Sequence, residues 1–280
     1  MYERELFDET LDINSTNNYD ISIQVGLDGF SFCLLDNLRN RFVMLREYKL
    51  TGRPDSICDQ VMEILNNDEF LGKQYRRYRV VFSFMQTTMV PAALYDPALK
   101  NEYFTLNDNL PEGNVISNNR VNEPDSFLLF DVRKDLLDLV VTAFPEATLS
   151  HQARPLLFGA FYRARSSKER YIQVHVEDTF FNLVVIDSLD LRFFNTFRIR
   201  NSSDILYYLL HSFEQMGIPE NEVVWLSGNV EKNDDLYLSL QKYIKTIKFA
   251  SPAGTNSLSY IFDNLDIHRY INLFNITSCA

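Results

Sequence analysis

Two similar stretches of the sequence place acidic side chains where strands are predicted to end. The first is IQVGLDGFSFCLLD (23–36), and the second is IQVHVEDTFFNLVVID (172–187). Asp28 in the first corresponds to Glu177 in the second, and Asp178 follows directly. Carboxylates are good ligands for Mg²⁺, but they repel a triphosphate unless a metal ion lies between. Neither turn contains a cationic side chain. The residues therefore raise the question of a metal or nucleotide site.

The elements around Asp28 predict three strands, a helix and a further strand. Period-two alternation and short apolar runs predict strands at 21–28, 30–35, 42–48 and 79–84. Between the last two strands, RPDSICDQVMEIL (53–65) predicts an amphipathic helix. Asp55 or Ser56 is the expected N-cap of that helix.

The same order of elements returns around Glu177. Strands are predicted at 172–177, 180–186, 191–199 and 222–227. The helix before the last strand carries an apolar stripe over 205–216, with Ser202 or Ser203 as the expected N-cap. Gly217 and Pro219 are typical helix-ending residues. The matched order β-β-β-α-β predicts a duplicated α/β fold; the alternative is two unrelated α/β segments.

The duplication suggests a division of the chain, in which strand and helix patterns between the copies predict an inserted α/β subdomain. The expected parts are a lead-in (1–18), a first repeat (19–97), the inserted subdomain (98–165) and a second repeat with a closing helix (166–280).

Composition and net charge limit the kinds of molecule that the protein is expected to bind. The chain has 280 residues, of which 46% are hydrophobic, enough for a large core. Its net charge of −11 argues against a general binder of nucleic-acid backbones, so we expect no nucleic-acid partner. One local exception is KQYRRYR (73–79). It is either a basic nucleic-acid patch or a solvated loop before a strand.

Other common chemistries lack their sequence patterns. Three cysteines without CxxC spacing argue against a disulfide framework and a zinc site. GxGxxG, Walker A, GxSxG and HExxH are missing from the sequence. His175 and Glu177 could form a catalytic pair, although a hydrogen-bonded strand histidine is the commoner arrangement.

Targeting signals also lack their usual patterns. The segment MYERELFDET has no apolar region of a signal peptide, and the apolar run PLLFGAFY (155–162) is too short to span a bilayer. We therefore expect a cytoplasmic protein without membrane insertion.

Four stretches carry a resemblance to a known family. They are VGLDGFSFCLLD (25–36), VPAALYD (90–96), VHVEDTFFNLVVID (174–187) and LDIHRYINLF (265–274). On these the chain resembles the DUF3822 family, uncharacterised Bacteroidetes proteins of unknown function. The resemblance and the duplicated elements imply the actin-like ATPase (ribonuclease H-like, ASKHA-type) fold, in which two β-β-β-α-β units flank a cleft.

The resemblance also implies where a nucleotide site would lie. In that fold two hairpin turns hold the phosphates, their acids position Mg²⁺, and a third, glycine-rich turn packs on adenosine. The matching positions in this chain are Asp28, Gly29, Ser31, Glu177, Asp178, Thr179 and Gly228. One acid per copy is kept, but the second turn has no glycine, and Phe30, Phe180 and Phe181 are bulky. These departures predict a vestigial cleft.

Three functions follow from this comparison. The first is a non-catalytic scaffold or partner-binding module, whose partner protein or second copy would bind the inserted subdomain. It would need no cofactor. The second is a nucleotide-responsive switch that binds ATP with magnesium through Asp28 and Glu177. The third is a divergent phosphotransferase related to sugar or acetate kinases, for which the sequence offers neither a base nor a phosphate clamp.

Overall fold

The computed structural model describes residues 2–51, 53, 56–167, 169–219 and 221–279. The chain folds into two compact units. The first comprises Met1–Pro155, Thr255–Leu265 and Asn272–Ala280, and the second comprises Leu156–Gly254 and Asp266–Ile271.

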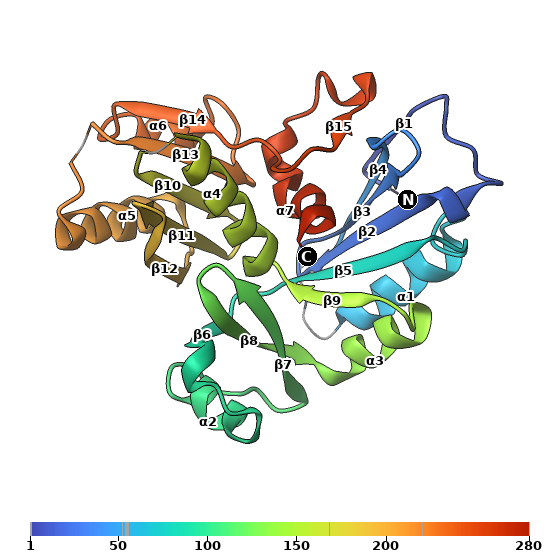
Figure 1. The fold of residues 1–280 in the computed structure, drawn as a ribbon, viewed down its shortest axis with the longest axis horizontal. Coiled ribbons are helices and arrows are strands. Elements are labelled where there is room, and N and C mark those ends of the chain that lie inside the picture. Colours follow the sequence, from blue (N-terminus) through green and yellow to red (C-terminus); the bar gives the residue numbers. More distant parts are fainter. Residues whose placement is uncertain (1, 52, 54–55, 168, 220, 280) are drawn as a thin grey trace. The chain divides into compact units, whose positions relative to one another are not determined.

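A mixed sheet forms the body of the first unit (Figure 1). Its order is β1-β4-β3-β2-β5-β9, with β15 beside β4. The strands are β1 (Arg4–Phe7), β2 (Tyr19–Gly26), β3 (Gly29–Asp36), β4 (Arg41–Lys49), β5 (Arg77–Ser83), β9 (Thr148–His151) and β15 (Ser257–Leu258). β2 pairs antiparallel with β3 and parallel with β5. The chain therefore crosses over between β4 and β5, and this crossover contains α1 (Ile57–Asn67).

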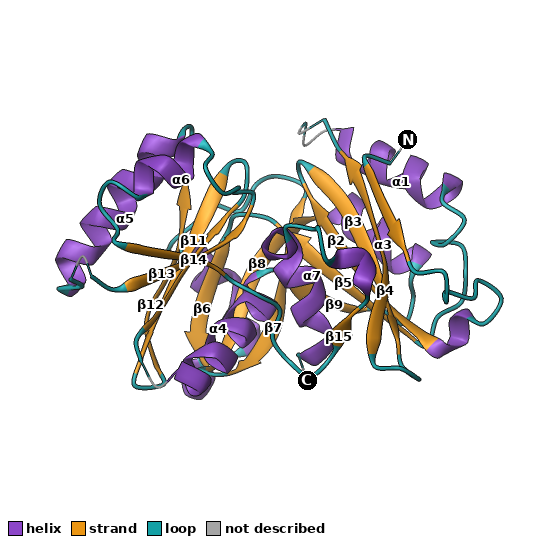
Figure 2. Ribbon diagram, turned by 90° about the horizontal axis from the view of Figure 1, so that it is seen from above, coloured by secondary structure: helices purple, strands orange, loops and turns teal. Residues whose placement is uncertain are grey.

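Both faces of this sheet are covered, which explains why β3 is buried almost throughout. Helices α1 and α3 (Lys134–Ala143) lie on one face, where Ile23 and Phe32 enter the core. The other face carries α7 (Ile271–Asn275), as Figure 2 shows. There the Phe274 ring meets Phe42 edge to face at 4.7 Å. Successive residues of a strand point to opposite faces, so a strand between two covered faces is apolar on both.

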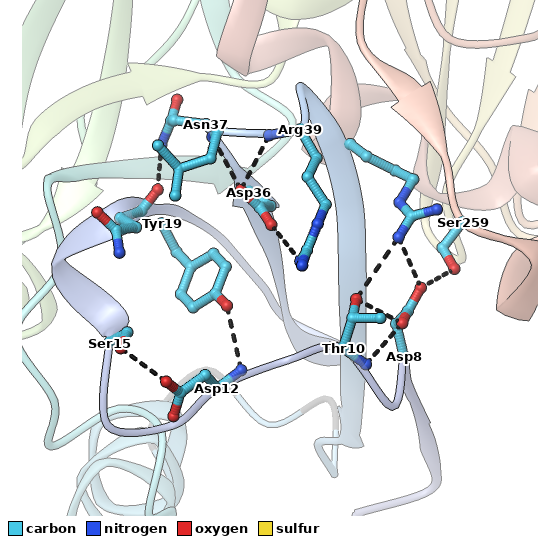
Figure 3. Close-up of polar contacts among 12 residues, drawn as sticks. Asp8, Thr10, Asp12, Ser15, Tyr19, Asp36, Asn37, Arg39 and Ser259 are labelled. Carbon is cyan, nitrogen blue, oxygen red and sulfur yellow. Dashed lines mark hydrogen bonds and ion pairs between the residues drawn. The ribbon is translucent and has the colours of Figure 1, made fainter.

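The N-terminal residues are tied to the same sheet. β1 pairs with β4, and Asp8 beyond it accepts hydrogen bonds from the Thr10 N–H (2.8 Å) and from the Ser259 hydroxyl (Figure 3). Arg41 lies 3.4 Å from the same carboxylate. Burial opposes ionisation of Asp8, but the hydrogen bonds from Ser259 and Thr10 outweigh it and lower its pKa. A charged anchor thus joins the start of the chain to the segment around Ser259.

A small separate sheet interrupts the first unit. Its order is β6-β8-β7, formed by β6 (Thr87–Pro91), β7 (Asn114–Asn122) and β8 (Asp125–Arg133). Helix α2 (Lys100–Thr105) packs on it through Phe104, which is fully buried. The inserted subdomain was expected at 98–165. In the structure the small sheet and α2 occupy 87–133, while α3 packs beside α1 and β9 extends the large sheet.

The second unit repeats the central plan of the first. Its sheet order is β12-β11-β10-β13-β14. The strands are β10 (Tyr171–Val176), β11 (Phe180–Asp187), β12 (Asp190–Arg198), β13 (Val223–Gly228) and β14 (Thr246–Phe249). The helices are α4 (Ala153–Ser167), which enters this unit at Leu156, α5 (Ser202–Met216) and α6 (Asp235–Leu240). β10 pairs antiparallel with β11 and parallel with β13, as β2 does with β3 and β5. The predicted duplication is therefore confirmed.

The expected caps of the two crossover helices differ from the observed ones. Asn201, rather than Ser202 or Ser203, is the N-cap of α5. Its side chain accepts from the Ser203 and Asp204 N–H groups, and the Asp204 carboxylate accepts from the Asn201 N–H. This reciprocal capping box satisfies more N–H groups than a serine one residue later could. At α1, Ser56 makes no side-chain cap bond, and Asp55 lies outside the described residues.

Across the part of the chain that the structure describes, no helix combines the length and apolar character needed to span a bilayer.

Candidate functional site

Asp28 lies in the short connection between β2 and β3. Its carbonyl accepts a hydrogen bond from the Leu50 N–H at 2.9 Å, which fixes the connection to the residue after β4. Its side chain is half-buried. The adjacent Gly29 has no positive φ, and a Cβ there would meet only the Tyr48 carbonyl, at 3.6 Å. This turn therefore does not require a glycine at position 29.

Ser31 and Phe30 point to opposite faces of β3. Phe30 is buried in the core against α1 and meets the Tyr48 ring edge to face at 6.2 Å. Ser31 pairs with Gln24 across the hairpin and is also nearly buried. Ser31 is thus a strand residue, and Phe30 occupies the core of the unit rather than the turn.

Glu177, Asp178 and Thr179 form the corresponding connection after β10. The Glu177 N–H donates to the Phe180 carbonyl (2.8 Å), and the Ile199 N–H donates to the Thr179 carbonyl (2.9 Å). Ile199 follows β12 as Leu50 follows β4. When the two turns are compared by this anchoring hydrogen bond, Asp28 corresponds to Thr179. When the preceding strands are aligned instead, Asp28 corresponds to Glu177. Turn geometry and sequence similarity therefore assign Asp28 different equivalents in the second unit.

Gly228 at the end of β13 is the glycine that the local backbone demands. Its φ is +81°, and a Cβ there would lie 2.1 Å from the Val176 carbonyl oxygen. This close approach lets the Asn229 N–H donate to that carbonyl at 2.7 Å. The Asn229 amide also donates to the Asp178 carboxylate. The structure thus brings Glu177, Asp178 and Gly228 together at the carboxyl ends of two parallel strands.

A buried polar chain lies directly behind Glu177. The Gln173 amide donates to Ser227 Oγ at 2.9 Å, and Ser227 Oγ lies 3.0 Å from His175 Nδ1. His175 Nε2 lies 3.2 Å from Glu177 Oε1. In the tautomer that suits an ionised carboxylate, which can only accept, a neutral His175 carries its proton on Nε2 and accepts from the serine hydroxyl through Nδ1. The bonds therefore run in one direction, from Gln173 to Glu177.

The buried polar chain has the order serine, histidine, acid that hydrolases use, but its environment differs from that of a hydrolase site. Ser227 is fully buried and Gln173 and His175 are nearly so. A nucleophile must reach its substrate, and Ser227 has no exposed surface. The arrangement instead holds the Glu177 carboxylate in place. Sequence reasoning found the His175 and Glu177 pair but missed Gln173 and Ser227. The sequence contains a signal for both residues, because every second residue of a strand points to the same face, and Gln173, His175 and Ser227 fall on one face of the predicted strands.

The remaining histidines serve structure or lie at the surface. His151 is fully buried, its Nε2 lies 2.9 Å from the Phe84 carbonyl, and burial lowers its pKa to about 4. His268 is buried against the Val230 carbonyl, and burial lowers its pKa too. His211 on α5, by contrast, is exposed. Among the described residues, no three His, Cys, Asp or Glu side chains gather as metal ligands.

Solved structures show the fold of this chain. A Bacteroides thetaiotaomicron protein with an actin-like ATPase fold and unknown function matches with a TM-score of 0.83 and 19% identity, over 97% of this chain and 100% of that one. The PilM-PilN type IV pilus biogenesis complex matches with a TM-score of 0.62 and 11% identity, over 93% and 98%. A ROK family glucokinase from Streptomyces griseus gives a TM-score of 0.46 at 9% identity, over 94% of this chain and 99% of that one.

The likeness to the Bacteroides thetaiotaomicron protein shows that the chain has the actin-like ATPase fold that its duplicated elements imply. A comparison with curated proteins finds no match. The family model described as "Protein of unknown function (DUF3822)" matches residues 8–247, which is most of the chain. The chain therefore belongs to the DUF3822 family.

Proposed function

We propose that this protein is a non-catalytic actin-like scaffold that docks a partner protein on its inserted subdomain. The observation that carries the proposal is a group of exposed leucines in one short segment. They are Leu94, Leu99, Leu106 and Leu110, here called the leucine segment (94–110). Of the eight leucines that are exposed among the described residues, these four lie in this segment. Grouped exposed apolar side chains commonly mark an interaction site.

The leucines are surplus to the packing of the subdomain itself. Its core is formed by Val90, Phe104, Ile116 and Leu129, with Tyr95 and Tyr103 packed beside it. The Tyr95 ring stacks on Phe127 at 4.0 Å, and the Tyr103 hydroxyl donates to the Leu94 carbonyl at 2.7 Å. These contacts hold the segment in one conformation. A preformed surface loses less conformational entropy when it binds.

Charge favours a basic partner over a second copy. The residues around the leucines include four acids (Asp96, Glu102, Asp108 and Glu112) and one lysine, Lys100. In a twofold dimer the same patch meets itself, so these like charges would repel. A partner segment that combines apolar and basic side chains would complement both features. We therefore infer a heterologous protein partner with such a segment.

Two further observations support a role without nucleotide chemistry. Gly29 has no backbone requirement, and the second turn has none of the close glycine approach that phosphate cradles use. Asp178 is already bonded to Asn229, and Glu177 to His175. A similar fold, PilM, is known in complex with a protein, PilN.

The test substitutes Leu106→Asp and compares it with Leu38→Asp. Both side chains are almost equally exposed, at 80% and 78%, but Leu38 lies in the β3–β4 turn, outside the segment. Burying one leucine contributes about 1.5–3 kcal/mol, so we expect capture of the partner to fall at least about tenfold with Leu106→Asp alone. The readout is quantitative mass spectrometry of captured proteins, followed by mapping of the bound segment.

Three results would count against the proposal. The first is that the capture of no protein depends on Leu106, and the second is that the mapped segment is acidic. Alternatively, light scattering could show a dimer that Leu106→Asp dissociates, which would make a second copy the occupant.

The nucleotide-switch alternative predicts a different result, which thermal unfolding with Mg-ATP, Mg-ADP and Mg-GTP can detect. A ligand at about one hundred times its dissociation constant stabilises by roughly 2.7 kcal/mol, a shift of several degrees. The scaffold proposal expects no shift. A shift with ATP that both Asp28→Ala and Glu177→Ala abolish would replace it with the switch. Phosphate transfer to a sugar or acetate would support the third, kinase-like function.

A further inference from the structure

A basic pocket lies in the first unit where β5 and β9 begin. It has a volume of about 430 Å³, within the usual range for small-molecule sites. Four arginines line it: Arg76, Arg77, Arg79 and Arg154. Glu146 is the acidic lining residue. This concentration of positive charge stands out in a chain whose net charge is −11.

Asp20 holds two of these guanidinium groups in place. It accepts from Arg76 Nε at 2.8 Å and from Arg79 Nη1 at 3.0 Å, and its side chain is almost fully buried. Burial opposes ionisation of Asp20, but the hydrogen bonds from Arg76 and Arg79 outweigh it and lower its pKa. Asn37 also donates to Asp20, at 2.8 Å. The two arginines are therefore ordered before any ligand arrives.

The other two arginines have different surroundings. Arg154 Nη1 donates to the neutral Ser150 hydroxyl at 3.2 Å. Arg77 is exposed, and within the described residues its guanidinium group makes no hydrogen bond or ion pair. Asp20 pairs with two of the four guanidinium groups, and Glu146 adds one carboxylate to the lining.

This geometry suits a phosphate group. Guanidinium groups bind phosphate through paired N–H donors, and these charge-assisted bonds are about twice as strong as neutral ones. A phosphate ester carries about −1.5 to −2 charges at neutral pH, so it attracts several guanidinium groups at once. Ile276 and Tyr78 form less polar walls. Such walls strengthen the field inside a pocket.

We propose that the basic pocket binds a small phosphate-bearing molecule. The net negative charge of the chain opposes a long polyanion but acts less on a small ligand held among the arginines. Within the first unit the site is separate from the Asp28 turn, because Arg76, Arg77 and Arg79 precede or begin β5, whereas Asp28 follows the far end of β2, which pairs parallel to β5. It is also independent of the leucine segment, so each proposal can fail alone.

The test is calorimetric titration of the full chain with pyrophosphate, inorganic phosphate and citrate. We expect pyrophosphate to bind one to one and more tightly than citrate, and to weaken when NaCl rises from about 50 to about 200 mM. Arg77→Gln removes a group without an internal partner, so the fold should be unchanged. Loss of a charge-assisted bond should weaken binding about tenfold or more.

Arg192→Gln is the matched control, because Arg192 is an exposed arginine of the second unit. We expect it to leave binding unchanged. Arg154→Gln gives a second, independent loss. No binding of pyrophosphate, or equal losses in Arg77→Gln and Arg192→Gln, would overturn the proposal. A short single-stranded oligonucleotide that binds more tightly than pyrophosphate would also overturn it, in favour of a nucleic acid.

Discussion

The parallel strand pair β2–β5 of the first unit and the pair β10–β13 of the second have the same register but different side chains. Ile23 pairs with Val80 as Ile172 pairs with Val224. Three residues on, Gly26 stands beside Ser83, whereas His175 stands beside Ser227. In the first unit a glycine therefore faces the strand serine. In the second, a buried imidazole binds that serine and reaches Glu177.

This difference changes the turn that follows. Beyond the pairs that both hairpins share, the hairpin of the second unit continues through His175–Asn182 and Val176–Phe181. Asp28 consequently lies within its turn, while Glu177 is held from behind by the polar chain. The two acids look equivalent in sequence but are positioned by different contacts. A duplicated topology therefore does not guarantee two equivalent halves of one site.

The largest expected effect comes from the glycines of the two units. Gly228→Ala would place a Cβ 2.1 Å from the Val176 carbonyl at a φ of +81°. Both the collision and the left-handed backbone are unfavourable, so we expect a loss of about 3 kcal/mol or more in the free energy of unfolding. Gly29→Ala in the first unit should change it by less than about 0.5 kcal/mol. Urea denaturation of both variants measures the difference.

Equal losses in the free energy of unfolding for Gly228→Ala and Gly29→Ala would contradict this comparison. That result would mean that the end of β13 moves away from β10 when a side chain is added at position 228. A structure of Gly228→Ala would then show the Asn229 to Val176 hydrogen bond broken.

The next effect concerns the buried polar chain. His175→Ala and Ser227→Ala each leave a buried polar partner without its bond, which typically costs about 1–3 kcal/mol. Because the two residues share one network, we expect their effects to be non-additive by about 0.5–3 kcal/mol in a double-mutant cycle. Gly26→Ala in the first unit should cost less than about 1 kcal/mol, since its Cβ would meet Ser83 at 3.4 Å.

A purely structural role for the buried polar chain also predicts that Ser227 is chemically unreactive. Buried Ser227 should not react with a fluorophosphonate probe, which labels activated serines. Labelling of Ser227 that His175→Ala abolishes would contradict the structural role and indicate a hydrolytic site.

Much of the fold could be predicted because it rests on periodic patterns. Alternation and apolar runs gave the paired strands around Asp28 and Glu177, since burial of one or two faces constrains every second residue. Residue-level details depended on tertiary contacts instead. The need for glycine at Gly228 arises from the carbonyl of Val176, on a strand distant in sequence. The role of Ser227 likewise depends on strand register, and the basic pocket on Asp20 pairing beside β5.

The smallest effect compares the equivalent crossover helices α5 and α1. The Asn201 side chain caps α5 by accepting from two N–H groups, and the Asn201 N–H donates to the Asp204 carboxylate in return. Ser56 instead donates to the Arg53 carbonyl, and its side chain caps no N–H group of α1. Asn201→Ala should therefore cost about 1 kcal/mol, and Ser56→Ala less than about half of that. Paired urea denaturation decides between them. If Ser56→Ala lowered the free energy of unfolding more than Asn201→Ala, the comparison of the two caps would be wrong, and Ser56 would stabilise α1 through some other contact.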